Sequence, residues 1–191
     1  MAEYFLVAGL GNPSAKYEKT RHNAGFWFVE KLASDKCVEF VPESRFSGLI
    51  ARFENAGRTV LLLKPQTFMN LSGRSVGAVS RYYKISSESI MVAHDELDFA
   101  AGVARLKLGG GHGCHNGLRD VISNLDANNF LRLRIGIGHP GDRSQVLDYV
   151  LGRPSGEDRH AIDDAIARSS QLLPKIVSGC IAEAMNRLHA T

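Results

Sequence analysis

The stretch Tyr4-Phe-Leu-Val-Ala-Gly-Leu-Gly11 decides the fold class, because it is a short apolar run that ends in glycine. Such a run, followed at once by Pro13, is typical of a buried strand that ends in a loop. Beyond the loop, Asn23 can cap a helix whose inward face includes Phe26 and Leu32. This part of the chain therefore predicts a β-loop-α unit.

The same alternation of strand and helix continues along the chain. Residues 49–53 and 59–63 flank a turn at Asn55-Ala-Gly57 and are expected to pair as a hairpin. Apolar spacing predicts a helix that begins at Ser72 and a largely helical segment over 155–189, interrupted near Pro174 and Gly179. Further strands are expected at 90–93, 102–108 and 131–137, and a further helix at about 118–125.

The chain is expected to be one domain over residues 1–191, since it has no repeat, low-complexity tract or linker. Alternating strands and helices with one hairpin predict an α/β fold with a mixed twisted β-sheet flanked by α-helices. Ligands of such sheets tend to bind beyond the carboxyl ends of the strands. The polar motifs of this sequence follow its predicted strands.

Composition narrows the class of protein. Hydrophobic residues make up 44% and charged residues 23%, as in ordinary soluble domains. Cys37, Cys114 and Cys180 form no paired spacing, which argues against a disulfide framework or a zinc cage. Without a signal-peptide pattern or an apolar run of ~20 residues, we expect a cytoplasmic protein with no membrane partner.

Charge is unevenly distributed although the net charge is only +3. Residues 99–145 carry six basic and three acidic residues, a local charge of +3. A phosphate-rich partner can dock on such a segment, although solvated surface arginines and lysines are an equally good explanation. The bases are Arg105, Lys107, Arg119, Arg132, Arg134 and Arg143.

Four polar clusters fall in predicted loops: 11–13 with 21–23, 68–70, 94–96 and 109–116. A histidine can act as a base at neutral pH when a carboxylate holds its second ring nitrogen and fixes the tautomer. His22 and Asp95 suit this dyad, while a surface or core role remains open for any one histidine. Asn12, Asn70 and Asn116 each offer a donor and an acceptor for gripping a carbonyl or a water.

Several other chemistries are disfavoured by the motifs. There is no GxSxG nucleophile elbow, and the neighbours Cys114 and His115 are expected to point apart. The glycine loop at 109–113 lacks the Gly-Lys-Ser/Thr ending of a nucleotide phosphate loop. Water activated by a base is therefore the simplest nucleophile.

Two alternatives remain open on these grounds. One is a metal-assisted esterase or phosphatase, although HExxH and structural zinc spacings are absent and no metal is expected. The other is a non-catalytic RNA-binding module that uses the basic segment, although no clear set of stacking aromatics is visible. The candidate metal ligands are His94, Asp95, Glu96, His112, His115 and His139.

Over nearly its whole length the chain resembles the bacterial peptidyl-tRNA hydrolases. Several long motifs in a fixed order carry the resemblance: Gly9-Leu-Gly-Asn-Pro13, Thr20-Arg-His-Asn-Ala-Gly25, Thr67-Phe-Met-Asn-Leu-Ser-Gly73, His94-Asp-Glu-Leu-Asp98, Gly109-Gly-Gly-His-Gly-Cys-His-Asn-Gly117, Arg132-Leu-Arg-Ile-Gly-Ile-Gly-His-Pro-Gly141 and Asn186-Arg-Leu188. One departure is Cys114, which stands where the family usually has glycine.

The resemblance implies a monomeric enzyme without cofactor that hydrolyses the ester of peptidyl-tRNA and recycles the tRNA after aborted translation. By matching position, His22 is the base that activates water and Asp95 orients it. The implied substrate contacts are Asn12, Tyr17, Phe68, Met69, Asn70, His115 and Asn116. Lys107 and Arg134 match the family's clamp on the 5′ phosphate of the tRNA acceptor region.

Overall fold

The computed structural model describes residues 3–190, and within them the chain forms a seven-stranded sheet in the order β2-β3-β4-β1-β5-β7-β6. β1, β4, β5 and β7 run parallel, whereas β2–β3, β3–β4 and β6–β7 are antiparallel pairs. The expected mixed sheet is therefore confirmed. The strands are β1 Tyr4–Gly9, β2 Val41–Glu43, β3 Gly48–Asn55, β4 Arg58–Pro65, β5 Ile90–Glu96, β6 Ala104–Leu108 and β7 Leu131–Gly136.

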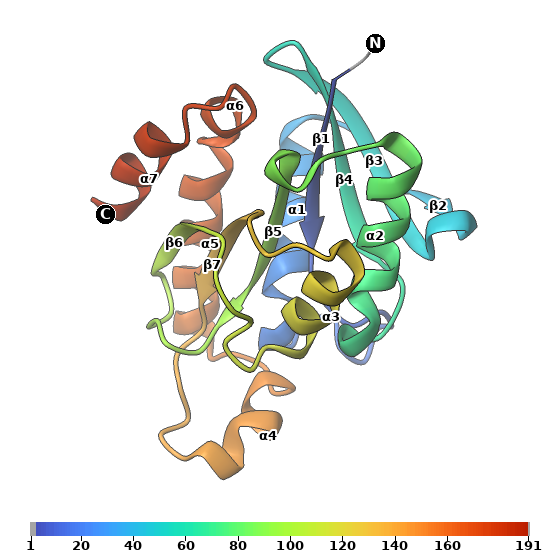
Figure 1. The fold of residues 1–191 in the computed structure, drawn as a ribbon. Helices are drawn as coiled ribbons and strands as arrows, with labels where there is room; N and C mark the ends of the chain where they lie inside the picture. The colour runs from blue at the N-terminus through green and yellow to red at the C-terminus, as the bar shows by residue number, and fades with distance from the viewer. Residues whose placement is uncertain (1–2, 191) are drawn as a thin grey trace.

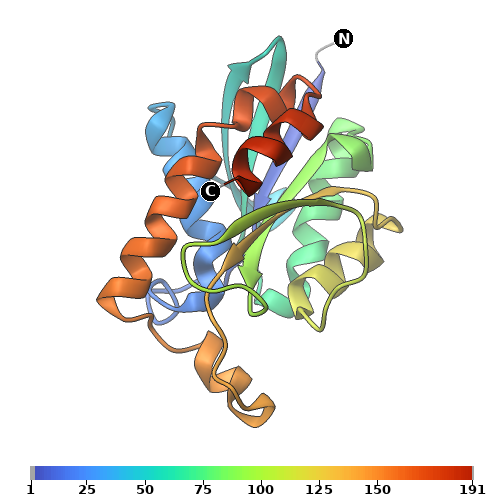
Figure 2. The same cartoon turned by 90° about the vertical axis from the view of Figure 1, so that its left-hand side faces the viewer.

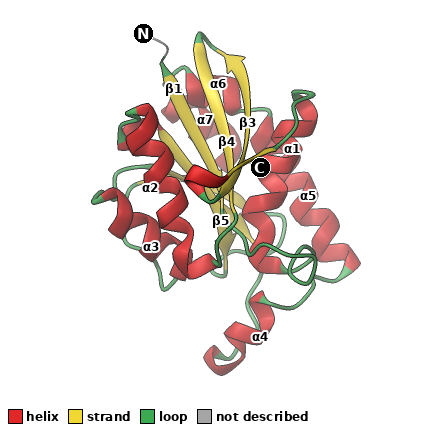
Figure 3. Ribbon diagram, turned by 90° about the vertical axis from the view of Figure 1, so that its right-hand side faces the viewer, coloured by secondary structure: helices red, strands yellow, loops and turns green. Residues whose placement is uncertain are grey.

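Helices cover both faces of this sheet. α1 and α5 lie on one face and α2 and α3 on the other, while α7 lies beside β6 (Figures 2 and 3). α4 projects below the sheet in Figure 1. The helices are α1 Ala24–Asp35, α2 Ser72–Tyr83, α3 Asn116–Leu125, α4 Val146–Val150, α5 Gly156–Ser170, α6 Leu173–Val177 and α7 Ile181–His189. No helix among residues 3–190 is both long and apolar enough to cross a membrane.

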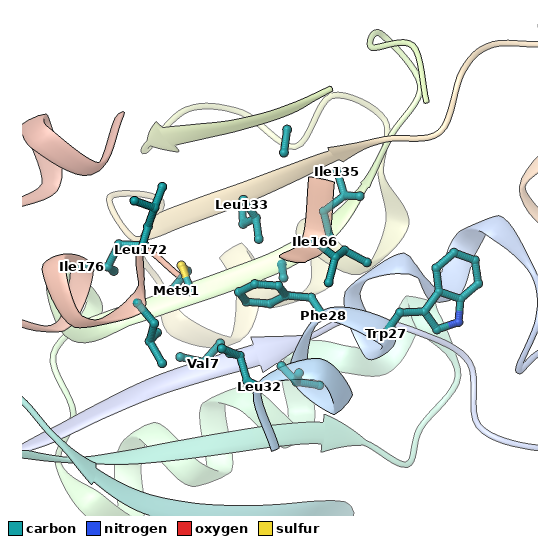
Figure 4. Packing of buried hydrophobic residues seen from close by; sticks show 14 of the residues in the cluster. Val7, Trp27, Phe28, Leu32, Met91, Leu133, Ile135, Ile166, Leu172 and Ile176 are labelled. Atoms are coloured by element: carbon teal, nitrogen blue, oxygen red, sulfur yellow. The ribbon is translucent and has the colours of Figure 1, made fainter. Parts of the chain in front are cut away.

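Two apolar cores fill the space between the sheet and its helices. Val7 and Phe28 belong to the core under α1 and α5, which Figure 4 shows in close view. Leu6 and Val76 belong to the core under α2 and α3. Because successive strand residues point to opposite faces, a central strand buried on both sides must be apolar throughout. This explains the unbroken apolar run of β1.

The carboxyl ends of β1 and β5 meet at one edge of the sheet, next to the turn that precedes α1 (η1, Arg21–Asn23). Gly9 and Gly25 permit this arrangement. A Cβ at Gly9 would collide with the carbonyl oxygen of Gly25, and one at Gly25 with the backbone of Leu10. The two glycines thus let α1 start against the end of β1 and bring η1 to the end of β5.

The predicted elements are largely confirmed, with four corrections. Asn23 precedes α1 but does not cap it, because its side chain bonds the backbone N–H and C=O of Asn12 instead. Residues 94–96 are the last residues of β5 rather than a loop, and Asn116 starts α3. β2 and α4 were not predicted. The helical segment over 155–189 is interrupted at both expected places: at 171–172, directly before α6 with Pro174 in its first turn, and around Gly179.

Candidate active site

A cavity of about 740 Å³ opens at the carboxyl ends of β5 and β7. His22, Asp95 and His115 line one part of it. Lys107 and Arg134 line another part, and residues of the segment that contains α4 form a further wall. The rule that ligands bind beyond strand ends therefore places a candidate site where the sequence motifs converge.

His22 and Asp95, which are 73 positions apart in sequence, form the dyad that the sequence predicted. Nδ1 of His22 lies 2.9 Å from each carboxylate oxygen of Asp95. A carboxylate only accepts, so Nδ1 carries the proton and Nε2 keeps its lone pair. Since Nε2 has no partner within residues 3–190, the neutral ring of His22 presents an unprotonated nitrogen at the cavity that it lines.

His115 also holds Asp95, which the sequence did not predict. Its Nε2 lies 2.9 Å from Oδ1 of Asp95, and its Nδ1 accepts a hydrogen bond of 3.2 Å from the backbone N–H of Leu118. His115 is thus the N-cap of α3, with Nδ1 as acceptor and Nε2–H as donor. Both ring nitrogens are engaged, so the expected contact with the tRNA end is not available to them in this arrangement.

The electrostatics of this triad favour an ionised Asp95. Burial opposes ionisation, but the adjacent His22 and His115 hold the pKa of Asp95 well below its usual range. Burial likewise opposes protonation of His22, yet the charge of Asp95 and its hydrogen bond raise the pKa of His22 above 6.5. Asp95 thus favours the protonated form of His22, which is the form that a general base reaches when it takes a proton.

His94 has a different role from its two neighbours. Only 2% of its surface is exposed, and its Nδ1–H donates to the backbone oxygen of Asp95 at 2.7 Å. Burial, together with nearby His115, lowers the pKa of His94 to about 3, so this ring is neutral at physiological pH. It packs edge-on against His115, with ring centroids 5.0 Å apart. His94 is therefore a neutral ring that packs beside His115. It lies in β5 and not in a loop as predicted.

Arg132 is an internal residue, although the sequence suggested a surface base. It is 2% exposed, and its guanidinium donates to the carbonyl oxygens of Gly110 and Gly111. This arginine therefore anchors the glycine-rich loop that leads to His115 and is not free for a phosphate. Amino-acid composition carries no signal for this role, because it counts the charge of an arginine but not its burial.

Asn12 joins two of the motifs. Its Oδ1 accepts a hydrogen bond of 2.7 Å from the backbone N–H of Met69, while its own backbone is bonded to Asn23. The amide Nδ2 of Asn12 keeps its donors, since no partner is found for it in the described part of the chain. Met69 is buried, in the 3-10 turn before α2 (η3, Met69–Leu71). The Asn12 carbonyl thus has a structural role and its amide remains available.

The other predicted substrate residues lie at different depths. Asn116 is exposed and lines the cavity with His22. Asn70 is exposed, Phe68 has 59% of its surface exposed, and Tyr17 is half-buried. Asn12 lines a smaller, separate hollow rather than the main cavity. The structure therefore gathers His22, Asp95, His115 and Asn116 around one cavity, with Asn12 and the 68–70 segment outside its lining.

Lys107 and Arg134 lie on the antiparallel strands β6 and β7 and line the same cavity as the dyad. They are not direct cross-strand partners, because Lys107 pairs with Arg132 and Arg134 with Arg105. Residues directly opposite on neighbouring strands share a face of the sheet. Lys107 shares a face with Arg132, and Arg134 lies two positions further along β7 on that same face. Lys107 and Arg134 thus form a basic wall beside the dyad.

One set of described residues has the composition of a metal site. Ligand atoms of His22, Asp95 and His115 lie within 4.8 Å of one another. Their geometry is equally that of a hydrogen-bonded triad, since both nitrogen–oxygen distances are 2.9 Å. The same three groups can therefore serve acid-base chemistry directly.

A contact that the sequence could not reveal ties the residue before His22 to the α4 segment. Nη1 of Arg21 donates to the backbone oxygen of Tyr149 at 3.1 Å, and its Cζ lies 3.9 Å from the centre of the Tyr149 ring. The two residues are 128 positions apart. Arg21 lies in a motif with His22, but no local pattern identified Tyr149 as its partner.

Comparison with known proteins agrees with this geometry. Residues 6–191 match the family model described as peptidyl-tRNA hydrolase. A peptidyl-tRNA hydrolase from Nitrosomonas europaea is 55% identical over 96% of this chain and 94% of its own, and one from Shewanella woodyi is 53% identical over 100% and 98%. A crystal structure of peptidyl-tRNA hydrolase from Acinetobacter baumannii superposes with a TM-score of 0.94, at 46% identity over 98% of this chain and 95% of that one.

Proposed function

This chain belongs to the peptidyl-tRNA hydrolase family, and on that premise we propose that His22 activates the water with which it hydrolyses the ester between peptide and tRNA. The observation that carries the proposal is the pairing of His22 Nδ1 with both oxygens of Asp95 at 2.9 Å. It leaves Nε2 unprotonated at a cavity large enough for the end of a substrate. The product is free tRNA, which returns to translation.

In the proposed reaction, Nε2 of His22 takes a proton from water as the water oxygen attacks the ester carbonyl. A tetrahedral intermediate forms with the negative charge on the former carbonyl oxygen. When it collapses, the bond to the ribose oxygen breaks and the imidazolium returns its proton to that oxygen. Asp95 stabilises the imidazolium in between and keeps the proton of the resting ring on Nδ1.

His115 is proposed to act through Asp95 rather than on the tRNA. Its Nε2–H bond holds Oδ1 of Asp95, and its Nδ1 is fixed by the N-terminus of α3. A carboxylate held at one oxygen by a second donor has little freedom to rotate away from His22. His115 is thus a positioning residue for the dyad.

The asparagines are proposed to hold the peptide ester. Asn116 lines the cavity with His22, which suits its amide for contact with the water or the ester oxygens. The free amide of Asn12 and the exposed side chain of Asn70 suit contacts to peptide groups. Tyr17, Phe68 and Met69 are proposed as walls of the peptide path.

Lys107 and Arg134 are proposed to bind the 5′ phosphate of the tRNA. Both line the cavity with the dyad, and Arg134 lies on the strand next to Asp95. An arginine and a lysine together can neutralise a terminal phosphate and set the distance between it and the scissile ester. We further propose a monomeric, cytoplasmic enzyme, which fits a substrate made by translation.

Lys107→Ala and Arg134→Ala are expected to weaken peptidyl-tRNA binding and to reduce its dependence on salt. Each contact with a phosphate releases about one counterion, so each loss should lower the slope of log K against log salt by roughly 1. The measurement is a titration of the binding constant with salt for both variants. A loss of the same size on a minimal peptidyl ester without the tRNA body would contradict the phosphate clamp.

The function itself is tested with purified protein and peptidyl-tRNA labelled in the peptide. Release of the peptide together with intact tRNA is the expected result, whereas retention of uncleaved peptidyl-tRNA would indicate an RNA-binding module. The assay is repeated after exhaustive chelation, because the triad can also ligate a metal. Loss of activity that returns with added metal would favour the metal-assisted alternative.

A further inference from the structure

We propose that Glu96 is a positioning residue for the phosphate clamp, which fixes the guanidinium of Arg134 in the orientation that meets the 5′ phosphate. The inference rests on the proposed function, because it takes Lys107 and Arg134 as the phosphate ligands. Glu96 follows Asp95 in β5 and lines the same cavity. The proposed hydrolysis mechanism does not use Glu96.

Glu96 and Asp95 serve two different sites from adjacent positions of one strand. Successive side chains of a strand point to opposite faces, and their Cα atoms are about 3.8 Å apart. Asp95 contacts His22 and His115, whereas Glu96 contacts Arg134. The end of β5 therefore ties the water-activating group and the phosphate-binding group to neighbouring points of a rigid backbone.

Both oxygens of the Glu96 carboxylate are held. Oε2 accepts a hydrogen bond of 2.8 Å from Nε of Arg134, and Oε1 accepts one of 3.1 Å from the backbone N–H of Asp98. The side chains of Glu96 and Arg134 are only 16% and 22% exposed, so solvent weakens the ion pair less than at an open surface. The carboxylate is a fixed partner for Arg134.

Phe99 is a second contact of the same guanidinium. Cζ of Arg134 lies over the Phe99 ring, 4.4 Å from its centroid, which is the distance of a cation–π contact. The loop that carries Phe99 can approach β7 because Gly136 has no Cβ, and a Cβ there would collide with the backbone oxygens of Ala100 and Val103. Gly138 N–H also donates to the Phe99 oxygen at 2.8 Å.

The two Nη atoms of Arg134, which Glu96 does not contact, form the edge of the guanidinium that is suited to phosphate. Glu96 takes only Nε, and neither Nη atom has a partner among residues 3–190. The two Nη groups can present parallel N–H donors to one anion, as arginine commonly does with phosphate. If Glu96 competed with the phosphate, its carboxylate would be expected on this Nη edge. Its position on Nε instead favours a role in holding the guanidinium in place.

The test is the ratio of kcat/KM for peptidyl-tRNA with a 5′ phosphate to kcat/KM for the same substrate with a 5′ hydroxyl. Both substrates are measured on one preparation, so the fraction of folded enzyme cancels. Glu96→Ala is expected to lower the ratio roughly tenfold towards that of Arg134→Ala, as for loss of one charge-assisted hydrogen bond. Glu96→Gln keeps one acceptor oxygen and is expected to lie between wild type and Glu96→Ala.

Glu39→Ala is the matched control, because Glu39 is an exposed acid with no ion pair among the described residues and its loss changes the net charge equally. It is expected to keep the wild-type ratio. A ratio that rises in both Glu96 variants would show that Glu96 competes with the phosphate for Arg134. A ratio that is unchanged in the Glu96 variants but reduced in Arg134→Ala would show that Arg134 binds the phosphate without help from Glu96. Either result overturns the proposal. A wild-type ratio near one would refute the phosphate clamp itself, and with it the positioning role of Glu96.

Discussion

His22→Ala is expected to lower kcat for peptidyl-tRNA by a factor of roughly 10²–10⁴, the usual contribution of a well-placed general base. The substitution removes the nitrogen that is proposed to take the proton from water, and it leaves the basic wall of Lys107 and Arg134 in place. Binding of peptidyl-tRNA should therefore stay close to that of the wild type. Single-turnover cleavage and a binding titration, measured on the same preparation, separate the two effects.

The matched control for this variant is His160→Ala, because His160 is exposed on α5 and is not among the residues that line the cavity. It should cleave at the wild-type rate. Near wild-type cleavage by His22→Ala would remove His22 from the mechanism. A large loss of binding with an unchanged single-turnover rate would reassign His22 to substrate binding.

Asp95→Asn is expected to lower kcat by a similar factor, roughly 10²–10⁴, although His22 is still present. The amide can donate a hydrogen bond to Nδ1 of His22, which favours the tautomer with its proton on Nε2. That tautomer cannot accept a proton from water at Nε2. The measurement is kcat and KM for peptidyl-tRNA, with the loss expected in kcat.

The fold of Asp95→Asn must be followed in parallel, because Asp95 is buried and holds two histidines. A cooperative thermal transition is expected in the variant together with the kcat defect. If the transition is lost and the residual folded enzyme turns over at the wild-type rate, Asp95 is a structural residue.

Sequence was sufficient for the fold class because the strands carry strong local patterns. The apolar run of β1 and the hairpin of β3 and β4 are set by burial and turn chemistry, which are local properties. β2 has three residues with Pro42 among them, and α4 has five, so neither has a periodic pattern to detect. Short elements of this kind are determined by tertiary contacts.

The candidate site was predictable in its residue types but not in its connections. An imidazole and a carboxylate in predicted loops made His22 and Asp95 candidates for acid-base chemistry, and the family resemblance implied their roles. The second bond to Asp95 from His115 and the burial of Arg132 depend on how the glycine-rich loop folds back over β7. Positions far apart in sequence determine both, so a single sequence has no signal for them.

The contact between Glu96 and Arg134 is another connection that the sequence alone did not reveal. The position of Glu96 after Asp95 was visible, but residues 94–96 were expected in a loop, so the sequence did not predict that the two carboxylates face apart. Its partner Arg134 lies 38 positions further along, on a strand whose place next to β5 follows only from the sheet order. A role could be proposed for Asp95 from its motif, whereas the contact of Glu96 depends on which strands are neighbours in the sheet.

The most direct test of the central claim is the pH dependence of single-turnover peptidyl-tRNA cleavage, from about pH 5 to about pH 9, in the wild type and in Asp95→Asn. His22 must be neutral to accept a proton, so the rate should rise with pH through the pKa of His22, which Asp95 raises above 6.5. Without the Asp95 charge, the remaining effect of burial lowers that pKa, and the midpoint of the residual activity should move to lower pH. A rate independent of pH in the wild type, or a midpoint that stays in place in Asp95→Asn, would contradict a His22 base held by Asp95.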